Sequence, residues 1–122
     1  MTVVDSCGWV DFFVDGSRAA RYARYLKSGT AVIVPTVTIY EVYKKIKRDS
    51  GEENALVAVA RMKQGTLAPL SDEIALRAAD LGLEHGLPMA DAIVYATARL
   101  CGAAVATHDP HFKDLEGVTF VE

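Results

Sequence analysis

The sequence has few of the features that mark a membrane, secreted or zinc-thiolate protein. Its 122 residues include two cysteines, Cys7 and Cys101, whose separation matches no metal-ligand spacing. We expect buried free thiols in a reducing compartment, with a disulfide between them as the alternative. No apolar run approaches the roughly 18 residues of a membrane span, and the N-terminus lacks the basic start and long apolar stretch of a signal peptide. These absences predict a cytoplasmic protein without a membrane partner.

An excess of positive charge is also missing. Lys and Arg number 13 against 16 Asp and Glu, and the formal net charge of −3 argues against a protein that holds nucleic acid with its whole surface. A local basic patch is compatible with this charge. Hydrophobic residues make up 51% of the chain, which is enough for one buried core, and no repeat, linker or low-complexity segment divides it. We therefore expect a single domain over residues 1–122.

Apolar runs alternate with helix signals along the chain. The apolar runs predict strands, the third weakened by a proline, at residues 2–4, 31–34, 66–70, 103–106 and 118–121. The helix signals predict helices at residues 6–14, 17–27, 36 or 37 to 48, 52–63, 71–85 and 90–100. Ser28-Gly29 is expected to end the second helix, and Gly86 and Gly102 the last two. This order predicts an α/β fold with three layers, α/β/α, around a mainly parallel sheet of about five strands.

Four acidic residues fall where such a fold places its chemistry. Ligands of open parallel sheets bind outside the carboxyl ends of the strands. Asp5 closes the first predicted strand, and Asp109 lies three residues beyond the fourth. Glu41 lies about two turns into the helix after the second strand, and Asp91 opens the helix that leads into the fourth. The four carboxylates are therefore expected to converge at one end of the sheet.

Four carboxylates at close range repel one another unless a cation compensates their charge. Mg²⁺ and Mn²⁺ are hard cations that prefer oxygen ligands, and such an ion activates water and stabilises charge on a phosphoryl group. A thiolate-free, carboxylate-rich set therefore favours phosphodiester hydrolysis over a structural zinc site.

Each acid also has a structural interpretation. Glu41 follows Thr38 at the spacing of a capping box, and Asp91 is placed to complement a helix dipole. Asp109 precedes a proline and matches a helix cap in a turn. Asp5 is harder to explain in this way, because an acid that closes an apolar strand is costly to bury without a partner. The functional interpretation rests on the four acids together.

The sequence resembles a known family at this point. Four segments carry the resemblance, at residues 3–6, 38–42, 87–98 and 106–112, and together they extend over essentially the whole chain. The most specific part is an Asp-Ala-Ile-x-x-Ala-x-Ala run that begins at Asp91, followed by a small-residue strand and a Thr-x-Asp-x-x-Phe motif that begins at Thr107. The pattern is similar to the PIN domain and, within it, to the VapC-type toxins.

The resemblance implies a metal-dependent endoribonuclease, the toxin of a type II toxin–antitoxin pair. Its acidic site would consist of Asp5, Glu41, Asp91 and Asp109. Of these, Asp5, Asp91 and Asp109 would bind Mg²⁺ or Mn²⁺. The hydroxyl groups of Ser6 and Thr107 would orient carboxylates or water. Such proteins act on RNA, form homodimers and are inhibited by a cognate antitoxin that inserts a peptide near the site. An alternative is a catalytically inactive PIN-like module that binds a protein partner and no metal.

This chain departs from the family pattern at His111, where similar sequences often carry a further acid. We expect His108 and His111 to face solvent, with phosphate contact as the alternative. Two other acidic Mg²⁺ folds fit less well. A receiver-like phosphoacceptor domain would need an acidic pair at the first strand and a lysine after the last, and a haloacid-dehalogenase-like phosphatase would need an aspartate in place of Cys7.

Positive charge clusters at the end of the helix that carries Glu41, on Lys44, Lys45, Lys47 and Arg48. A helix dipole favours cations there. The same cluster would suit contact with RNA phosphates, which an acidic protein can make through a local basic edge.

Overall fold

The structure is a computed structural model that describes residues 1–27 and 31–122. Its strands are β1 (Thr2–Val4), β2 (Val32–Pro35), β3 (Thr66–Ala68), β4 (Ala104–Thr107) and β5 (Val118–Phe120). Its helices are α1 (Ser6–Phe13), α2 (Ala19–Leu26), α3 (Thr36–Ser50), α4 (Glu52–Met62), α5 (Asp72–His85), α6 (Met89–Cys101) and the short 3₁₀ helix η1 (Pro110–Phe112).

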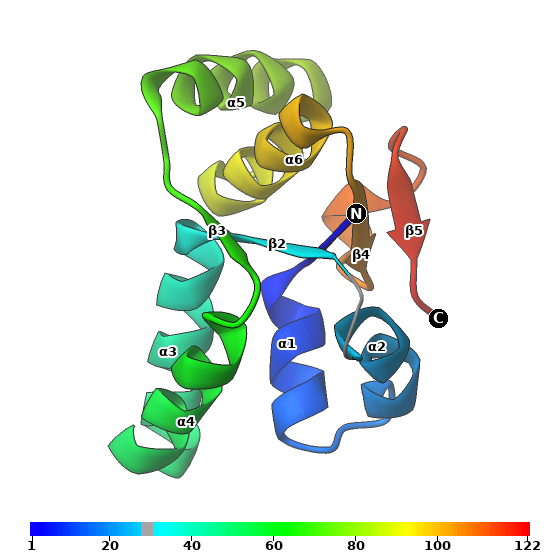
Figure 1. Cartoon of the computed structure of the whole chain (residues 1–122). Coiled ribbons are helices and arrows are strands. Elements are labelled where there is room, and N and C mark those ends of the chain that lie inside the picture. Colours follow the sequence, from blue (N-terminus) through cyan, green and yellow to red (C-terminus); the bar gives the residue numbers. More distant parts are fainter. Residues whose placement is uncertain (28–30) are drawn as a thin grey trace.

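The strands form one sheet in the order β3-β2-β1-β4-β5, and all four pairings are parallel. Within the described ranges this gives the five-stranded parallel sheet that the sequence predicts. β1 lies at the centre, with Thr2 paired to Val32 on one side and to Ala104 on the other. The chain builds the sheet outward from β1 in one direction and then returns to add β4 on the other side (Figure 1). The gap between the carboxyl ends of β1 and β4 is therefore a topological switch point.

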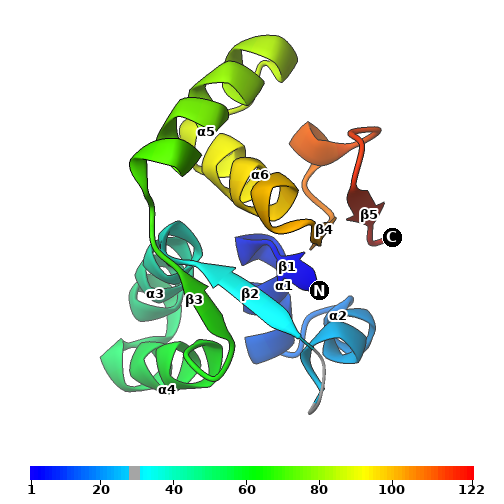
Figure 2. The ribbon, with the colours of Figure 1, turned by 45° about the horizontal axis from the view of Figure 1, so that its top comes forward.

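Helices cover both faces of the sheet. Consecutive strand residues point to opposite faces, so Val4 and Ala106 pack with α1–α4, whereas Val3 and Val105 pack with α6 and η1. Figures 1 and 2 show α1–α4 on one side of the sheet and α5 and α6 on the other. The prediction of a three-layer α/β/α fold is confirmed.

Local signals set most of the helix ends. The Ser71 hydroxyl accepts the Ile74 N–H at 3.1 Å and so caps α5. Gly86 and Gly102 end α5 and α6 in the left-handed conformation, with φ of 66° and 67°. The predicted helix stop at Ser28-Gly29 lies outside the described residues. η1 is new, because the sequence indicated only a turn there.

A close helix contact lies beneath the switch point. A Cβ atom on Gly8 of α1 would overlap the ring of Tyr22, so α2 approaches α1 at a distance that only glycine permits. Tyr22 is fully buried and reaches His108 beyond β4, with 2.7 Å between its hydroxyl and Nδ1. The first helical pair is thereby joined to the loop that carries Asp109.

Both cysteines are free thiols. Cys7 is half-buried, but Cys101 is exposed at the end of α6, so the expectation of burial is wrong for Cys101. Among the residues placed by the structure, no helix combines the length and apolar character that crossing a membrane requires.

Candidate functional site

The four predicted acids gather at the carboxyl end of the sheet. Asp5 follows β1 directly and Asp109 lies two residues beyond β4, while Glu41 is in the second turn of α3 and Asp91 in the first turn of α6. Their charges act on one another: Asp5 and Asp109 both raise the pKa of Glu41, and all three of these acids raise the pKa of Asp91. The structure therefore brings together the acids that the sequence singled out, from four separate elements.

Asp5 lies at the centre of this group and is only 1% exposed. One carboxylate oxygen accepts the Ser6 N–H at 2.9 Å, which caps α1, and the other accepts the Thr107 hydroxyl at 2.9 Å. Burial raises the pKa of Asp5, although these hydrogen bonds oppose the increase. A carboxylate this deeply buried is held by donors from β4 and α1 in one orientation.

Thr107 connects two of the acids. While its hydroxyl donates to Asp5, the same oxygen accepts the backbone N–H of Asp109 at 3.0 Å. The Cys7 sulfur lies 3.4 Å from that hydroxyl oxygen and 3.7 Å from a carboxylate oxygen of Asp5. Thr107 therefore fixes both the orientation of Asp5 and the path of the chain into Asp109.

Glu41 does not cap its helix. Because α3 begins at Thr36 with Pro35 at its N-cap, Thr38 lies inside the helix, and the capping-box interpretation is wrong. Burial, followed by the charge of Asp5, raises the pKa of Glu41, and a hydrogen bond from the Ser6 side chain opposes this. Oε1 of Glu41 is buried without a hydrogen-bond partner among the described residues. A buried carboxylate oxygen of this kind needs a cation or a donor from outside the chain.

Asp91 and Asp109 lie at helix starts, as their structural interpretations predicted, and both also face the group of acids. Asp91 is in the first turn of α6, and Asp109 caps η1 by accepting the His111 N–H at 2.9 Å. Burial first, and then the charges of Asp5 and Asp109, raise the pKa of Asp91 to about 7, while His111 opposes the increase. The structural and functional interpretations of these two acids are therefore compatible.

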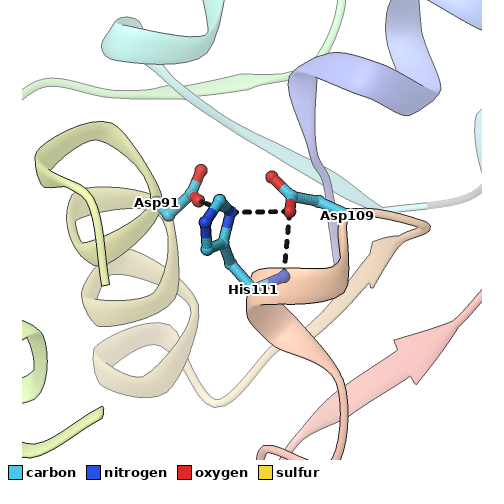
Figure 3. A group of neighbouring side chains, drawn as sticks. All are labelled: Asp91, Asp109 and His111. Carbon is cyan, nitrogen blue, oxygen red and sulfur yellow. Dashed lines mark hydrogen bonds and ion pairs between the residues drawn. The ribbon is translucent and has the colours of Figure 1, made fainter. Parts of the chain in front are cut away.

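His111 is the site residue whose contacts the sequence did not predict. Its Nδ1 lies 2.8 Å from an Asp109 oxygen and 3.2 Å from an Asp91 oxygen, between the two acids (Figure 3). The His111 side chain is 54% exposed, but its ring nitrogen faces the acids rather than water alone. His108 likewise has a partner in Tyr22. His111 is exposed as expected, although its Nδ1 contacts two acids, whereas the expectation is wrong for His108, which is half-buried against Tyr22.

The donor set fits a hard divalent cation. Three acids have raised pKa values, and for Glu41 and Asp91 the charges of neighbouring carboxylates are part of the cause. Within the described part of the chain an oxygen of Glu41 has no hydrogen-bond partner, and Asp91, Asp109 and His111 place one ligand atom each within 4.8 Å of one another. Carboxylate oxygens are the ligands that Mg²⁺ and Mn²⁺ prefer, and a divalent charge would offset their repulsion.

A cleft of about 350 Å³ opens beside the acids between α1 and α3. Glu41 and Lys45 line it from α3, Ser6 and Asp11 from α1, and His108 from the loop after β4. Lys45 is one helical turn beyond Glu41, so a positive side chain borders the acidic group. An extended, negatively charged chain lying in this cleft would pass directly over Glu41.

Comparison with known proteins identifies the family. The fold and site define a three-layer α/β/α protein with a carboxylate-rich centre at the switch point of a parallel sheet. The sequence matches the PIN domain family over residues 2–118. Because this match includes nearly the whole chain, the protein belongs to the PIN domain family. No curated protein matches its sequence.

Solved structures with the same fold come from several bacteria. A toxin–antitoxin complex from Klebsiella pneumoniae contains a chain with 25% identity and a TM-score of 0.81, the alignment covering 100% of this chain and 98% of that one. Mycobacterium tuberculosis VapC20, a Sarcin-Ricin loop cleaving toxin, aligns at 17% identity over 86% and 87% of the two chains, with a TM-score of 0.74. DNA-bound VapBC from Salmonella typhimurium aligns at 13% identity over 98% and 95%, with a TM-score of 0.77.

Proposed function

We propose that this protein is a metal-dependent endoribonuclease and the toxin of a type II toxin–antitoxin pair. The observation that carries the proposal is the convergence of Asp5, Glu41, Asp91 and Asp109, with raised pKa values for the first three and a Glu41 oxygen that has no partner among the described residues. Membership of the PIN domain family supports it, as does the likeness to a chain from a toxin–antitoxin complex. The neighbour described as a Sarcin-Ricin loop cleaving toxin supports RNA as the substrate.

Asp5, Asp91 and Asp109 would hold Mg²⁺ or Mn²⁺. When bound, the ion supplies Lewis acidity to a phosphoryl oxygen and lowers the pKa of a coordinated water. Glu41 would orient the attacking water and take its proton on the carboxylate, a role suited to a carboxylate whose pKa is raised. The water oxygen would form a new bond to phosphorus while the bond to the leaving ribose oxygen breaks, and that oxygen would take up a proton from solvent. Ser6 and Thr107 keep the carboxylates oriented during this exchange.

RNA would approach along α3. Lys44 and Lys47 are held over the rings of Tyr40 and Tyr43, with 5.5 and 5.4 Å between the ammonium nitrogen and the ring centre, and Lys45 lines the cleft. Of these lysines, Lys45 lines the cleft with Glu41, on a protein whose net charge is −3, and its ammonium also pairs with Asp49 at 3.3 Å. Phosphate contacts of this kind hold RNA without reading its sequence. The substrate and the free thiols agree with a cytoplasmic location.

Two grooves, one of mixed polarity and one apolar, provide room for two protein partners. A groove of about 400 Å³ is lined by α1, α3 and α4, including Phe13, Val14, Ile46 and Val57, and successive turns of α1 and α3 also line the cleft at the acids. An antitoxin segment lying in this groove would extend into the site.

The second surface lies away from the acids, between α5 and α6. Its groove of about 640 Å³ is bordered by Leu83 and Met89, which are 88% and 78% exposed. Exposed apolar surface of this kind marks an interaction site. We assign it to the second copy in a homodimer. A Leu83→Glu variant should then be a monomer by light scattering while still binding its antitoxin.

The nuclease proposal is tested with purified protein and a mixed RNA pool. Cutting should require Mg²⁺ or Mn²⁺, should stop in EDTA, and should leave ends without 2′,3′-cyclic phosphate, because water rather than a ribose hydroxyl attacks. Cutting that persists in EDTA would overturn the proposal. If no RNA is cut, calorimetric titration with Mn²⁺ decides between the two proposals. If Mn²⁺ does not bind, the protein is instead an inactive PIN-like module that binds a partner.

A further inference from the structure

The His111 ring points into the acidic group rather than away from it. Its Nδ1 contacts one oxygen of Asp91 and one of Asp109, on two elements that meet at the switch point (Figure 3). We propose that His111 Nδ1 is a direct ligand of the metal ion and that it shifts the preference of the site from Mg²⁺ towards borderline transition ions such as Co²⁺ and Zn²⁺. This inference rests on the proposed function, because it concerns the ion of the same site.

The spacing of the three ligand atoms suits a shared ion. Neighbouring ligands around an octahedral ion with bonds of about 2.0–2.1 Å stand about 2.9 Å apart. Tetrahedral ligands at about 2.0–2.1 Å stand about 3.3 Å apart. The Nδ1 of His111 lies 2.8 Å from an Asp109 oxygen and 3.2 Å from an Asp91 oxygen, close to these two separations.

The ring is held in place by its neighbours along the chain. The backbone N–H of His111 donates to the same Asp109 oxygen that its ring contacts, at 2.9 and 2.8 Å. On the other side, Phe112 is fully buried and lies against Tyr95 with 6.3 Å between ring centres. η1 is thereby held at one end by the Asp109 cap and at the other by Phe112, which is buried in the core. A ligand fixed in this way gives up little conformational freedom when an ion binds.

The chemistry of the donor atoms determines which ion the site binds more tightly. Carboxylate and water ligands suit Mg²⁺ and Mn²⁺, whereas an imidazole nitrogen suits zinc and the later transition ions. Replacing a carboxylate by imidazole also makes the ligand set less negative by one charge, which weakens the attraction for a hard ion that depends on charge alone. The site of this chain should therefore prefer Co²⁺ and Zn²⁺ over Mg²⁺, measured as a ratio of affinities, more strongly than an all-carboxylate site does.

An alternative role for His111 is that of a cation that only neutralises Asp91 and Asp109. In that case an incoming metal ion would displace the ring, and replacing the ring would not weaken binding of Co²⁺. The two roles therefore predict opposite results for the same variant.

The test uses the full chain and has a direct structural readout. The three histidines, His85, His108 and His111, give separate ring signals in long-range ¹H–¹⁵N NMR spectra. Addition of Zn²⁺ should move the Nδ1 signal of His111 to the range of a metal-bound nitrogen. The ring signals of His85, which lies on α5 beside Tyr95, should stay unchanged.

Calorimetry with Co²⁺ and Mg²⁺ gives the second readout. The His111→Gln variant should bind Co²⁺ more weakly by at least about the 10- to 100-fold loss that even outer-sphere partners cause. Its Mg²⁺ affinity should change far less. The His111→Asp variant should bind Mg²⁺ more tightly, and the matched control His85→Gln should resemble the wild type. Circular dichroism checks that each variant is folded.

Two results would count against the inference in distinguishable ways. If Zn²⁺ and Co²⁺ bind but the His111 signals do not move and His111→Gln binds equally well, the ligand assignment fails and the proposed nuclease stands. If no divalent ion binds to the wild type, the proposed function itself fails.

Discussion

Replacing Asp91 by asparagine should stabilise the metal-free protein while it damages the site. Asp91 is held among other acids, its side chain is only 12% exposed, and its pKa is raised to about 7 by burial and by the charges of Asp5 and Asp109. A raised pKa in the folded state means that folding favours the protonated acid. The contribution of the Asp91 carboxyl to the free energy of unfolding is therefore fully present below about pH 4, and it is lost as the pH rises through about 7. Asparagine keeps the shape of the side chain and removes this loss.

The size of the effect follows from the two pKa values. A rise from 3.8 to about 7 corresponds to roughly 4 kcal/mol of unfolding free energy above both values, which is an upper limit because neighbouring acids can relax. We expect Asp91→Asn to gain about 2–4 kcal/mol over the wild type between about pH 4 and pH 8. At about 3–5 °C per kcal/mol for a chain of this size, its melting temperature at pH 8 should rise by about 10 °C.

Thermal and urea unfolding in EDTA at several pH values would measure this gain. The exposed Asp80→Asn substitution on α5 is the matched control and should show no such pH-dependent gain. Saturating Mn²⁺ should reverse the order, because the ion stabilises only the protein that binds it. A gain of equal size at pH 4 and pH 8, or no gain at all, would refute the reasoning that the acids repel one another in the folded state.

Four further substitutions test single residues of the fold and the site. Gly8→Ala should lower the free energy of unfolding by about 1–3 kcal/mol, because its Cβ would overlap an aromatic ring of α2, whereas Gly82→Ala, with ordinary contacts in α5, should raise it by about 0.5–1 kcal/mol. Thr107→Val removes the hydroxyl bonded to Asp5 and should cost about 1.5–3 kcal/mol in urea unfolding, more at pH 8 than at pH 4. Glu41→Gln should keep Mn²⁺ binding in calorimetry but slow RNA cutting by about 10²–10⁴-fold.

Each of these expectations has a contrary result. Equal stability of the two alanine variants would contradict the close approach of α1 and α2. A Thr107→Val variant as stable as the wild type would mean that Asp5 does not depend on its hydrogen bond. Rapid cutting by Glu41→Gln would remove Glu41 from the proposed proton transfer.

The fold could be predicted because its signals are local. The cap at Ser71 and the glycines at positions 86 and 102 each act within one turn of the chain, and the short apolar runs between helices indicate a parallel sheet. The carboxyl ends of parallel strands then determine which polar residues can meet. Asp5, after β1, and Asp109, after β4, were found in this way.

The finer contacts could not be predicted, because they depend on how distant elements pack. The capping-box interpretation of Thr38 is a different case, because the sequence already predicted a helix start at residue 36 or 37 and α3 begins at Thr36. The contact of His111 with Asp91 joins η1 to α6 across the switch point, and nothing in the local sequence fixes it. The sequence did mark position 111 as a departure from the family pattern, which was the available signal.

The central claim is that the converging acids make this chain a metal-dependent ribonuclease. The most direct measurement is single-turnover cutting of an RNA selected from the pool, by the wild type, by Asp5→Asn and by the control Asp80→Asn, in Mn²⁺ and in EDTA. The account predicts cutting by the wild type and by Asp80→Asn in Mn²⁺, and none by Asp5→Asn or in EDTA, with all three proteins folded. Cutting by Asp5→Asn at the wild-type rate would contradict it.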